Sequence, residues 1–465
     1  MKLNMTSLVT ALVVLSPHIA LAQEAEPGFS AADTAFVATC ALLVMLMMLP
    51  GLGLFYAGMA RSKNVLSVMT QMFASIALCC VLWIVIGYSL AFTDGGPVDG
   101  FIGGLDRVLL AGVTPDSMVG TIPEYIFVLF MMMFAAITPP LIIGAFAERM
   151  KFAAVLLFLA IWLLINYVPM AHMAWGSGWV IGVEPQDFAG GNVVHLNAGL
   201  AALICALMIG PRRGYGSVMM APHNMTMTYT GGAMLWVGWL AFCGGCALAI
   251  NGFTGMVMLN TMVGGAGGAL GWMAVEWVHR KRASTFGLLS GAIAGLVAVT
   301  PACGFVGSAG AIVIGFLTAP ICLWAVEVVK RRIGYDDSFD VFGVHGVAGI
   351  VGGILTVIFA APALGGTGWP EGRGLVSQMG VQLAIMAFSM AYCALTTVIA
   401  LKLTATITGG LRADAETEHD GLDTAEHGET GYRLDDGLFG AALLPPSEGV
   451  AQTQTVVRRT AEEGV

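Results

Sequence analysis

The sequence predicts an all-α membrane protein with eleven transmembrane helices, arranged as a 5+5 inverted repeat plus one further helix. Three observations lead to this fold class. The 465 residues are 57% hydrophobic and only 11% charged. Apolar stretches of about 20 residues, the length that crosses a bilayer as a helix, recur along the chain. Lysine and arginine gather in alternate connections between these stretches, as they do in cytoplasmic loops of membrane proteins.

Residues 1–22 have the features of a cleavable signal peptide. Lys2 supplies the positive start, residues 8–15 form a short apolar core, and residues 20–22 (Ala-Leu-Ala) give an A-x-A cleavage site. An uncleaved first helix is the alternative, but the apolar core is too short to span a bilayer and Pro17 interrupts its end. The mature chain is therefore expected to begin at Gln23 on the outer side of the membrane.

Eleven apolar stretches follow, and glycine is abundant in them. The chain has 62 glycines, and small residues let helix backbones approach closely in lipid, where packing replaces the hydrophobic effect. The transmembrane domain is expected to occupy residues 23–409. Its spans are expected at residues 34–58, 64–92, 121–147, 152–174, 192–210, 224–248, 255–279, 285–300, 308–329, 342–362 and 376–404.

The basic residues predict the orientation of these spans. One set of alternate loops carries twelve lysines and arginines, whereas the opposite loops carry only Arg107 and Arg373. Because basic residues are enriched in cytoplasmic loops, the mature N-terminus is expected in the periplasm and the C-terminus in the cytoplasm of an inner-membrane protein. The basic set consists of Arg61, Lys63, Arg149, Lys151, Arg212, Arg213, Arg280, Lys281, Arg282, Lys330, Arg331 and Arg332.

Two histidines occupy corresponding places in the two halves. His195 is near the start of the fifth span and His345 near the start of the tenth, and each closely follows an aspartate, Asp187 and Asp340. An ionisable side chain inside a membrane is costly and marks a functional site by default. A histidine that only bonds to a neighbouring helix is the plainer alternative. Two histidines at repeat-related positions favour one polar path through the bundle instead.

Nine cysteines lie in the apolar segments or at their ends, and this odd number does not indicate a disulfide framework. Cys243 and Cys246 have CxxC spacing, but the sequence offers no second such motif and no histidine close by. Neither a metal site nor a cofactor is therefore predicted. The histidines His172, His223 and His279 lie at span ends and are given no special role.

Residues 410–465 differ in composition from the spans and are expected to form a cytoplasmic regulatory tail. The tail is acidic between Asp414 and Glu429 and then becomes polar and proline-bearing. Such a composition cannot bury a core, so the final part is expected to be disordered.

Several segments resemble the ammonium transporter family (Amt/Mep/Rh), in type its bacterial Amt members, from about residue 34 to 432. The resemblance implies a homotrimer of eleven-helix subunits in a lipid bilayer, each with its own pore, and a transporter rather than an enzyme. It also implies a PII-type regulatory protein as a partner at the cytoplasmic face, where residues 421–429 match a family motif. The segments that carry the resemblance are residues 55–67, 171–176, 187–197, 291–304 and 340–346.

The resemblance further implies an outer substrate site formed by Phe134, Trp175 and Cys246. Aromatic rings, tryptophan above all, compensate a cation for lost water. Cys246 stands where the family has a serine, and a thiol is a weaker hydrogen-bonding group than a hydroxyl, so a looser site is expected. Cys243 is a second departure from the family pattern, and whether the two thiols pair is left open.

Below this site, the resemblance implies a gate of stacked rings and then a pore lined by the histidine pair. Burial favours neutral imidazoles, which together offer one donor and one acceptor to ammonia. Asp187 is expected to give structural and electrostatic support. On spacing alone the phenylalanines would be packing residues and Asp187 a helix cap. The gate residues are Phe130, Phe134 and Phe242, and the pore-lining residues are His195, His345, Trp239 and Tyr167.

The expected function is that of an ammonium transporter or channel, for which methylammonium serves as an analogue. It recruits NH4+ at the outer site, deprotonates it and conducts NH3 with net charge movement. The alternative is an ammonium sensor that signals through the tail. A membrane redox or metal enzyme built on Cys243 and Cys246, and conduction of another gas, are further alternatives. No nucleic-acid partner is expected.

Overall fold

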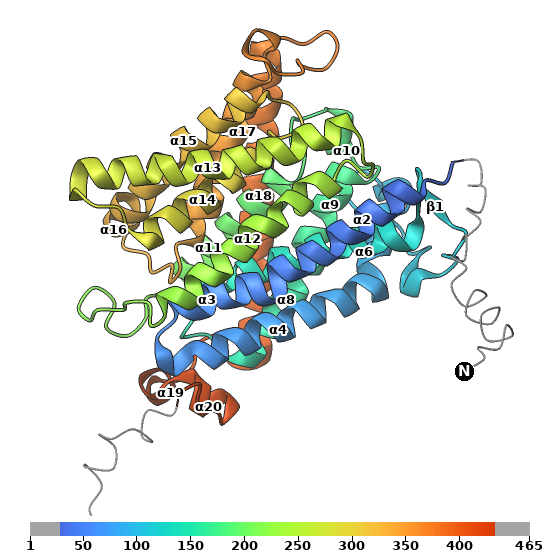
Figure 1. The fold of residues 1–465 in the computed structure, drawn as a ribbon. Coiled ribbons are helices and arrows are strands. Elements are labelled where there is room, and N and C mark those ends of the chain that lie inside the picture. Colours follow the sequence, from blue (N-terminus) through green and yellow to red (C-terminus); the bar gives the residue numbers. More distant parts are fainter. Residues whose placement is uncertain (1–27, 433–465) are drawn as a thin grey trace, which may run out of the picture.

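A computed structural model describes residues 28–432 as a bundle of long helices (Figure 1). The expected signal peptide, residues 1–22, lies outside the described residues, as do residues 433–465 of the expected tail. Between the second and third spans, β1 (Met118–Val119) and β2 (Ile122–Pro123) form a short antiparallel hairpin.

Eight helical segments in the described part of the chain are long and apolar enough to cross a membrane. The other three expected spans are helical as well: α12 (Met225–Gly245) and α13 (Gly252–Arg280) are long but less apolar, and α14 (Thr285–Val299) is apolar but shorter. All eleven expected spans are therefore helical. The eight segments are Ala31–Met59, Ser62–Phe92, Glu124–Phe146, Phe152–Gly182, Gly191–Ile209, Ser308–Ile333, Phe342–Phe359 and Leu375–Thr408.

Most of these segments are built from several consecutive helices. Pro50 lies in the first π-helical turn. Proline has no N–H and cannot donate the backbone hydrogen bond of an α-helix, so it is tolerated where the α-helical bonding pattern is already interrupted. The first half contains α2 (Ala31–Leu46), η1 (Met47–Leu52), α3 (Gly53–Met59), α4 (Val65–Leu82), η3 (Trp83–Gly87), α5 (Tyr88–Phe92), α6 (Glu124–Leu141), α7 (Ile143–Phe146), α8 (Phe152–Trp162), η6 (Leu163–Tyr167), α9 (Val168–Trp175), α10 (Trp179–Gly182), η7 (Gly191–Leu196) and α11 (Asn197–Ile209).

The second half continues from α12, α13 and α14 and ends in the helices of the tail. Helices α13, α14 and α15 pack closely, since a Cβ at Gly268 would lie only 2.2 Å from the carbonyl oxygen of Gly291. The remaining elements are α15 (Ser308–Trp324), η8 (Ala325–Val329), α16 (Lys330–Ile333), η9 (Phe342–Gly346), α17 (Val347–Phe359), α18 (Leu375–Thr408), α19 (Ala415–Asp420) and α20 (Leu422–His427).

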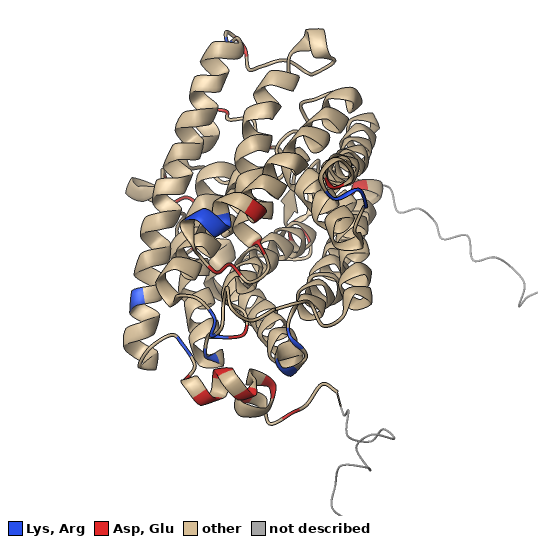
Figure 2. Ribbon diagram, turned by 90° about the vertical axis from the view of Figure 1, so that its left-hand side faces the viewer, with Lys and Arg blue, Asp and Glu red and all other residues tan. Residues whose placement is uncertain are grey.

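The bundle has two ends of different character (Figure 1). One end, called the hairpin face here, carries β1, α10 and the start of α2; the opposite end, the tail face, carries α16, α19 and α20. Figure 2 shows that most of the helical body lacks charged residues and that acidic side chains gather in α19 and α20. Large apolar side chains such as Phe73 and Leu395 are exposed around the bundle. This surface is suited to lipid rather than water, as in a multi-pass membrane protein.

The tail is docked onto the tail face through backbone hydrogen bonds. The carboxylate of Asp423 in α20 accepts from the N–H groups of Leu66 and Ser67, at 3.0 and 2.7 Å, in the first turn of α4. In return, the side-chain oxygen of Asn64 accepts from the N–H of Leu422 at 2.8 Å. A carboxylate at a helix N-terminus accepts hydrogen bonds from the free N–H groups and interacts favourably with the positive end of the helix dipole. The tail therefore caps α4.

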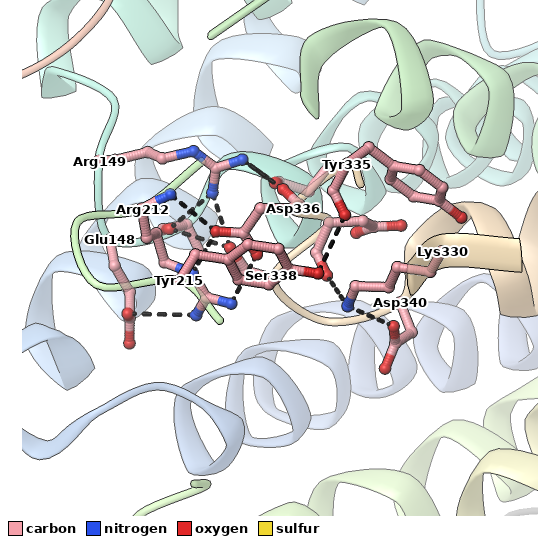
Figure 3. A network of polar contacts seen from close by, with 12 residues as sticks. Glu148, Arg149, Arg212, Tyr215, Lys330, Tyr335, Asp336, Ser338 and Asp340 are labelled. Carbon is pink, nitrogen blue, oxygen red and sulfur yellow. Dashed lines mark hydrogen bonds and ion pairs between the residues drawn. The ribbon is translucent and has the colours of Figure 1, made fainter. Parts of the chain in front are cut away.

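A buried ion network joins the loops of both halves at the tail face (Figure 3). Arg212 forms two hydrogen bonds with Asp336, at 2.8 and 2.9 Å, and contacts Glu148 at 3.3 Å. Arg149 donates to Ser338 at 2.8 Å. Although burial by itself raises the pKa of Asp336, the Arg212 guanidinium outweighs it and holds this pKa below its usual range. The pairing offsets the cost of burying these charges.

Candidate functional site

His195 and His345 lie in helices that enter the bundle from opposite faces. His195 belongs to η7, whose start contacts Trp175 on the hairpin face, because a Cβ at Gly190 would lie 3.0 Å from that indole. His345 belongs to η9, which starts directly after the ion network of the tail face. Both histidines sit in π-turns, which are wider than an α-turn and are frequent at functional sites.

An aspartate precedes each of these helices, eight residues before the histidine. The carboxylate of Asp187 accepts from the three N–H groups of residues 190–192 at 2.5–3.1 Å. The carboxylate of Asp337 accepts from the N–H of Phe342 at 2.8 Å. Both carboxylates thus cap the positive end of a helix. They stabilise the two helix starts and leave the imidazoles to contact each other.

Asp340 is nearer to His345 in the sequence, but it is not the counterpart of Asp187. Its carboxylate pairs with the ammonium of Lys330 at 2.7 Å instead of capping the helix. Asp340 has a φ of 61°, and Gly190, at the same place in the first half, has a φ of 98°. The chain therefore turns through the left-handed region before both helices, and aspartate is one of the few side chains that adopts it.

The two histidine-bearing helices cross at a pair of equivalent glycines. A Cβ at Gly199 would lie 2.2 Å from the backbone nitrogen of Gly346, and a Cβ at Gly349 would lie 3.0 Å from that of Leu196. Contacts below 3.0 Å require the backbone to move. The absence of side chains at these positions lets the backbones touch and brings the two imidazoles together.

The imidazoles of His195 and His345 face each other in the middle of the bundle. Their Nδ1 atoms are 3.4 Å apart, and the rings are nearly parallel, with an interplanar angle of 26°. They are 1% and 5% exposed. Two neutral rings in hydrogen-bond contact must be opposite tautomers, one donating and one accepting. Such a pair then presents one Nε2–H and one bare Nε2 to its surroundings.

A narrow apolar cavity lies beside the histidine pair. Its volume is about 10 Å³, roughly the room that one water-sized molecule needs. The indole of Trp239 stacks on His195 at 5.0 Å and is held by a hydrogen bond from its Nε1 to Thr300 at 2.8 Å. The lining residues are Met47, Leu52, Phe55, Ile137, Leu141, Val194, His195, Leu235, Trp239, Phe242, Ile293 and His345.

Stacked phenyl rings separate this cavity from a larger one that opens on the hairpin face. Phe134 and Phe242 have centroids 4.1 Å apart and are nearly parallel, and Phe130 packs edge-on against Phe134 at 5.2 Å. The larger cavity measures about 210 Å³ and is mostly aromatic. Its lining residues are Phe92, Phe127, Phe130, Met131, Phe134, Ala174, Trp175, Ile181, Phe188, Cys246 and Leu248.

Cys246 lines this aromatic cavity, where its thiol contacts the carbonyl oxygen of Phe242 at 3.2 Å. Cys243 is buried behind it, and both are free thiols. Tyr167 is fully buried but is not among the residues that line the described cavities. Within residues 28–432, no group of three or more histidine, cysteine, aspartate or glutamate side chains is placed to hold a metal ion.

On the other side of the histidines, the path continues towards the tail face. A small cavity that includes Ser290, Asp340 and His345 shares Asp340 and Trp272 with an open cavity of about 340 Å³. The cavities are thus arranged in sequence from face to face, with the phenyl rings and the histidines at the narrowest part. Such a series can select a small solute that sheds its water.

Comparison with known proteins places this geometry in a family. Residues 35–432 match the profile of the Ammonium Transporter Family. The chain belongs to the ammonium transporter family. It is 43% identical over 405 residues to an ammonium transporter of Bacillus subtilis, covering 86% of this chain and 98% of that protein.

Solved structures of the family agree with this fold. The crystal structure of Candida albicans Mep2 has a TM-score of 0.78 and 36% identity, covering 90% of this chain and 94% of that one. A structure titled Sensor Amt Protein has a TM-score of 0.78 and 28% identity, covering 85% and 98%. The chain is therefore an ammonium transporter by family and a non-enzymatic membrane protein.

The structure brings together most of the residues that the sequence singled out. Phe134, Trp175 and Cys246 share the aromatic cavity, and the two histidines meet below it. Asp337 belongs to an acidic cluster after a basic loop, for which the sequence favours salt bridges or helix caps, and it is a cap. The sequence reasoning missed the glycines at the helix crossing, whose signal was their equal spacing from the histidines.

Replacing Gly199 with alanine tests the helix crossing. The new Cβ would overlap the backbone of Gly346, so the folded state should lose roughly 1–3 kcal/mol, the usual cost of overpacking. Gly380→Ala is the matched control, because a Cβ there meets nothing within 4 Å and alanine favours a helix at either position. Thermal unfolding in detergent should show a lower midpoint for Gly199→Ala only. Equal midpoints for the two variants would contradict the crossing.

The Asp337 cap predicts a specific pH dependence of stability. Burial raises the pKa of Asp337 to about 6, above that of an aspartate in the unfolded chain. The folded protein therefore binds a proton at Asp337 more tightly than the unfolded chain does. The protonated side chain contributes stability that is complete below about pH 4 and is lost as the pH rises through about 6. The difference in unfolding temperature between the unchanged protein and Asp337→Asn should become smaller as the pH rises from about 4 to about 6. A difference that stays constant or rises would refute the raised pKa.

Proposed function

We propose that this ammonium transporter is a homotrimeric protein of the inner membrane, with one conducting pore in each eleven-span subunit. The hairpin face is periplasmic and the tail face cytoplasmic. The positions of Arg61, Arg149 and Arg212 support this orientation, because they lie in the tail-face loops and basic residues favour the cytoplasmic side.

Ammonium enters through the aromatic cavity of the hairpin face. Phe134 and Trp175 supply ring faces that attract a cation as it loses water, and their centroids are 5.7 Å apart. Cys246 adds a weakly polar thiol on the same wall. Asp187 contributes negative charge nearby, although its carboxylate is engaged by three N–H groups. The cavity therefore concentrates a small monovalent cation without binding it tightly.

Ammonium transfers its proton to water at the open mouth of the aromatic cavity, and the resulting ammonia alone passes the phenyl gate. The space beside the histidines is nearly dry, and moving an intact ion into an apolar cavity is far more costly than moving a neutral molecule. Ammonia is small enough to pass when the rings of Phe134 and Phe242 separate briefly. Sodium and potassium cannot release a proton to become neutral, so the same barrier excludes them.

The histidine pair carries the proposal. An ammonia molecule beside it can accept from one Nε2–H and donate to the other, bare Nε2. The pair thereby replaces some of the hydrogen bonds that ammonia leaves behind in water. Trp239 and the surrounding apolar residues keep competing water out. The solute leaves through the tail-face cavities and is protonated again in the cytoplasm.

The tail is the place at which a partner can act on this path. Its helices cap α4 and pair with the loop after α11, where Glu418 accepts from the N–H of Arg213 at 2.7 Å. A PII-type regulator bound at the tail face would both close the exit and alter these contacts. This partner and the trimer follow from the family and are proposed for this chain.

Alanine at either pore histidine should lower methylammonium uptake. His195→Ala and His345→Ala each remove one hydrogen-bonding partner from a dry cavity, so the initial rate should fall at least about tenfold, the factor for one buried hydrogen bond. The measurement is uptake of labelled methylammonium by cells that lack other transporters. His279→Ala, an exposed position at the end of α13, is the control. Full uptake by both pore variants would defeat the mechanism.

Restoring a hydroxyl at the outer site should tighten it. Cys246→Ser replaces a weak thiol with a stronger acceptor, so the KM for methylammonium should fall by about two- to tenfold, the range of one modest hydrogen bond. Cys80→Ser, a half-buried cysteine of α4 outside the cavities, provides the control. An unchanged or higher KM for Cys246→Ser would mean that this side chain does not contact the ion.

Flux distinguishes transport from signalling. The structure titled Sensor Amt Protein favours the sensor as the second candidate. A transporter that moves the proton as well as ammonia should give an ammonium-dependent current in proteoliposomes on a solid-supported membrane, and should rescue growth of a transporter-deficient strain on low ammonium. A sensor gives neither result. Rescue without current would leave transport in place but make it electroneutral.

A further inference from the structure

His172 is a buried histidine that the proposed pathway does not use. It lies in α9, three residues before Trp175, and has no exposed surface. Its Nδ1 is 3.0 Å from the carbonyl oxygen of Ala91, and its Nε2 is 2.5 Å from the carbonyl oxygen of Asp99. The sequence offered only its place at a span end, which suggested no role.

Two carbonyl oxygens on one imidazole limit its protonation state. A carbonyl oxygen only accepts hydrogen bonds, and a neutral imidazole carries a single N–H. In the neutral form, one ring nitrogen would point its lone pair at a carbonyl oxygen, and the fully buried ring has no exposed surface at which to relieve this repulsion. The doubly protonated imidazolium donates at both positions. The contacts of His172 therefore fit the charged ring and no neutral tautomer.

A counter-ion stands beside this ring. The carboxylate of Asp99 is 3.7 Å from Nε2, and it is fixed by the N–H of Gly95 and the hydroxyl of Ser177, both at 2.8 Å. These two hydrogen bonds hold the pKa of Asp99 below its usual range. The side of the His172 ring that faces α5 contacts only the uncharged carbonyl group of Ala91. Within residues 28–432, the only ion pair of His172 is with Asp99.

The ring joins two walls of the aromatic cavity. Ala91 immediately precedes Phe92 at the end of α5, while His172 lies one turn before Trp175 in α9, and both aromatic residues line the cavity. A Cβ at Gly176 would lie 2.5 Å from the Ala91 carbonyl oxygen and 3.0 Å from Nδ1 of His172. The glycine after Trp175 thus leaves room for this bridge.

We propose that His172 is a buried imidazolium that positions Trp175 against Phe92 and so maintains the affinity of the outer site. The proposal rests on the proposed role of the aromatic cavity as the ammonium site. His172 does not touch the solute; it acts through the two walls that it connects. Where one of its two hydrogen bonds is lost, the walls separate, and the KM for the cation rises while the maximal rate is retained.

The protonation state can be tested without transport. Solid-state ¹⁵N NMR of protein labelled at its histidines, compared with His172→Gln protein, isolates the two ring nitrogens of His172. At neutral pH both should carry protons. A non-protonated ring nitrogen at His172 would overturn the proposal, whatever the outcome of uptake measurements.

Asp99→Asn tests the functional part and avoids removing the ring. The asparagine oxygen still accepts from Gly95 and Ser177, but the negative charge that favours the imidazolium is gone. The KM for methylammonium should therefore be higher in Asp99→Asn than in the unchanged protein, by about tenfold for one lost charge-assisted hydrogen bond. The maximal rate should be unchanged. Equal KM values for the two proteins would refute the positioning role.

The pore-histidine variants separate this test from that of the pathway itself. If His195→Ala transports normally, the proposed pathway fails, but the NMR result for His172 still stands or falls alone. If the pore variants lose uptake and Asp99→Asn keeps the KM of the unchanged protein, the pathway holds and the role of His172 is rejected.

Discussion

The close crossing of two helices that enter from opposite faces is the contact on which the site depends. At Gly199 and Gly349 the backbones meet without intervening side chains, and His195 and His345, four residues before each glycine, are brought into contact as a result. A Cβ at Gly199 would overlap the backbone of Gly346, so a larger residue there would push the two helices apart. The rest of the bundle surrounds this crossing with apolar side chains.

Electrostatics explains why each helix start carries an aspartate that does not pair with its histidine. Asp187 and Asp337 each accept hydrogen bonds from backbone N–H groups, so their carboxyl groups stabilise helix ends and do not contact the imidazoles. His172 shows the contrast, because it has Asp99 beside it and two carbonyl oxygens around it.

Much of the architecture could be predicted from the sequence, because hydropathy and charge are local properties. The positions of the spans follow from apolar length, and the pair His195 and His345 follows from its place in the two halves. Closeness in the sequence does not decide which aspartate caps the second helix, since Asp340, the nearest to His345, pairs with Lys330 instead. Asp337 stands as far before its histidine as Asp187 does, and equal spacing is what an internal repeat preserves.

The sequence by itself determined the membrane class, the segments that become helices and the residues from which a polar path could be built. Only the tertiary structure decided which of them touch. His172 meets carbonyl groups 81 and 73 residues earlier in the chain, and Arg212 meets an aspartate 124 residues later. Whether a segment forms a helix, and whether its apolar stretch is long enough to span a bilayer, depend on residues that are neighbours in the chain. Hydrogen-bond partners and cavities depend on how the finished helices pack, which no local pattern records.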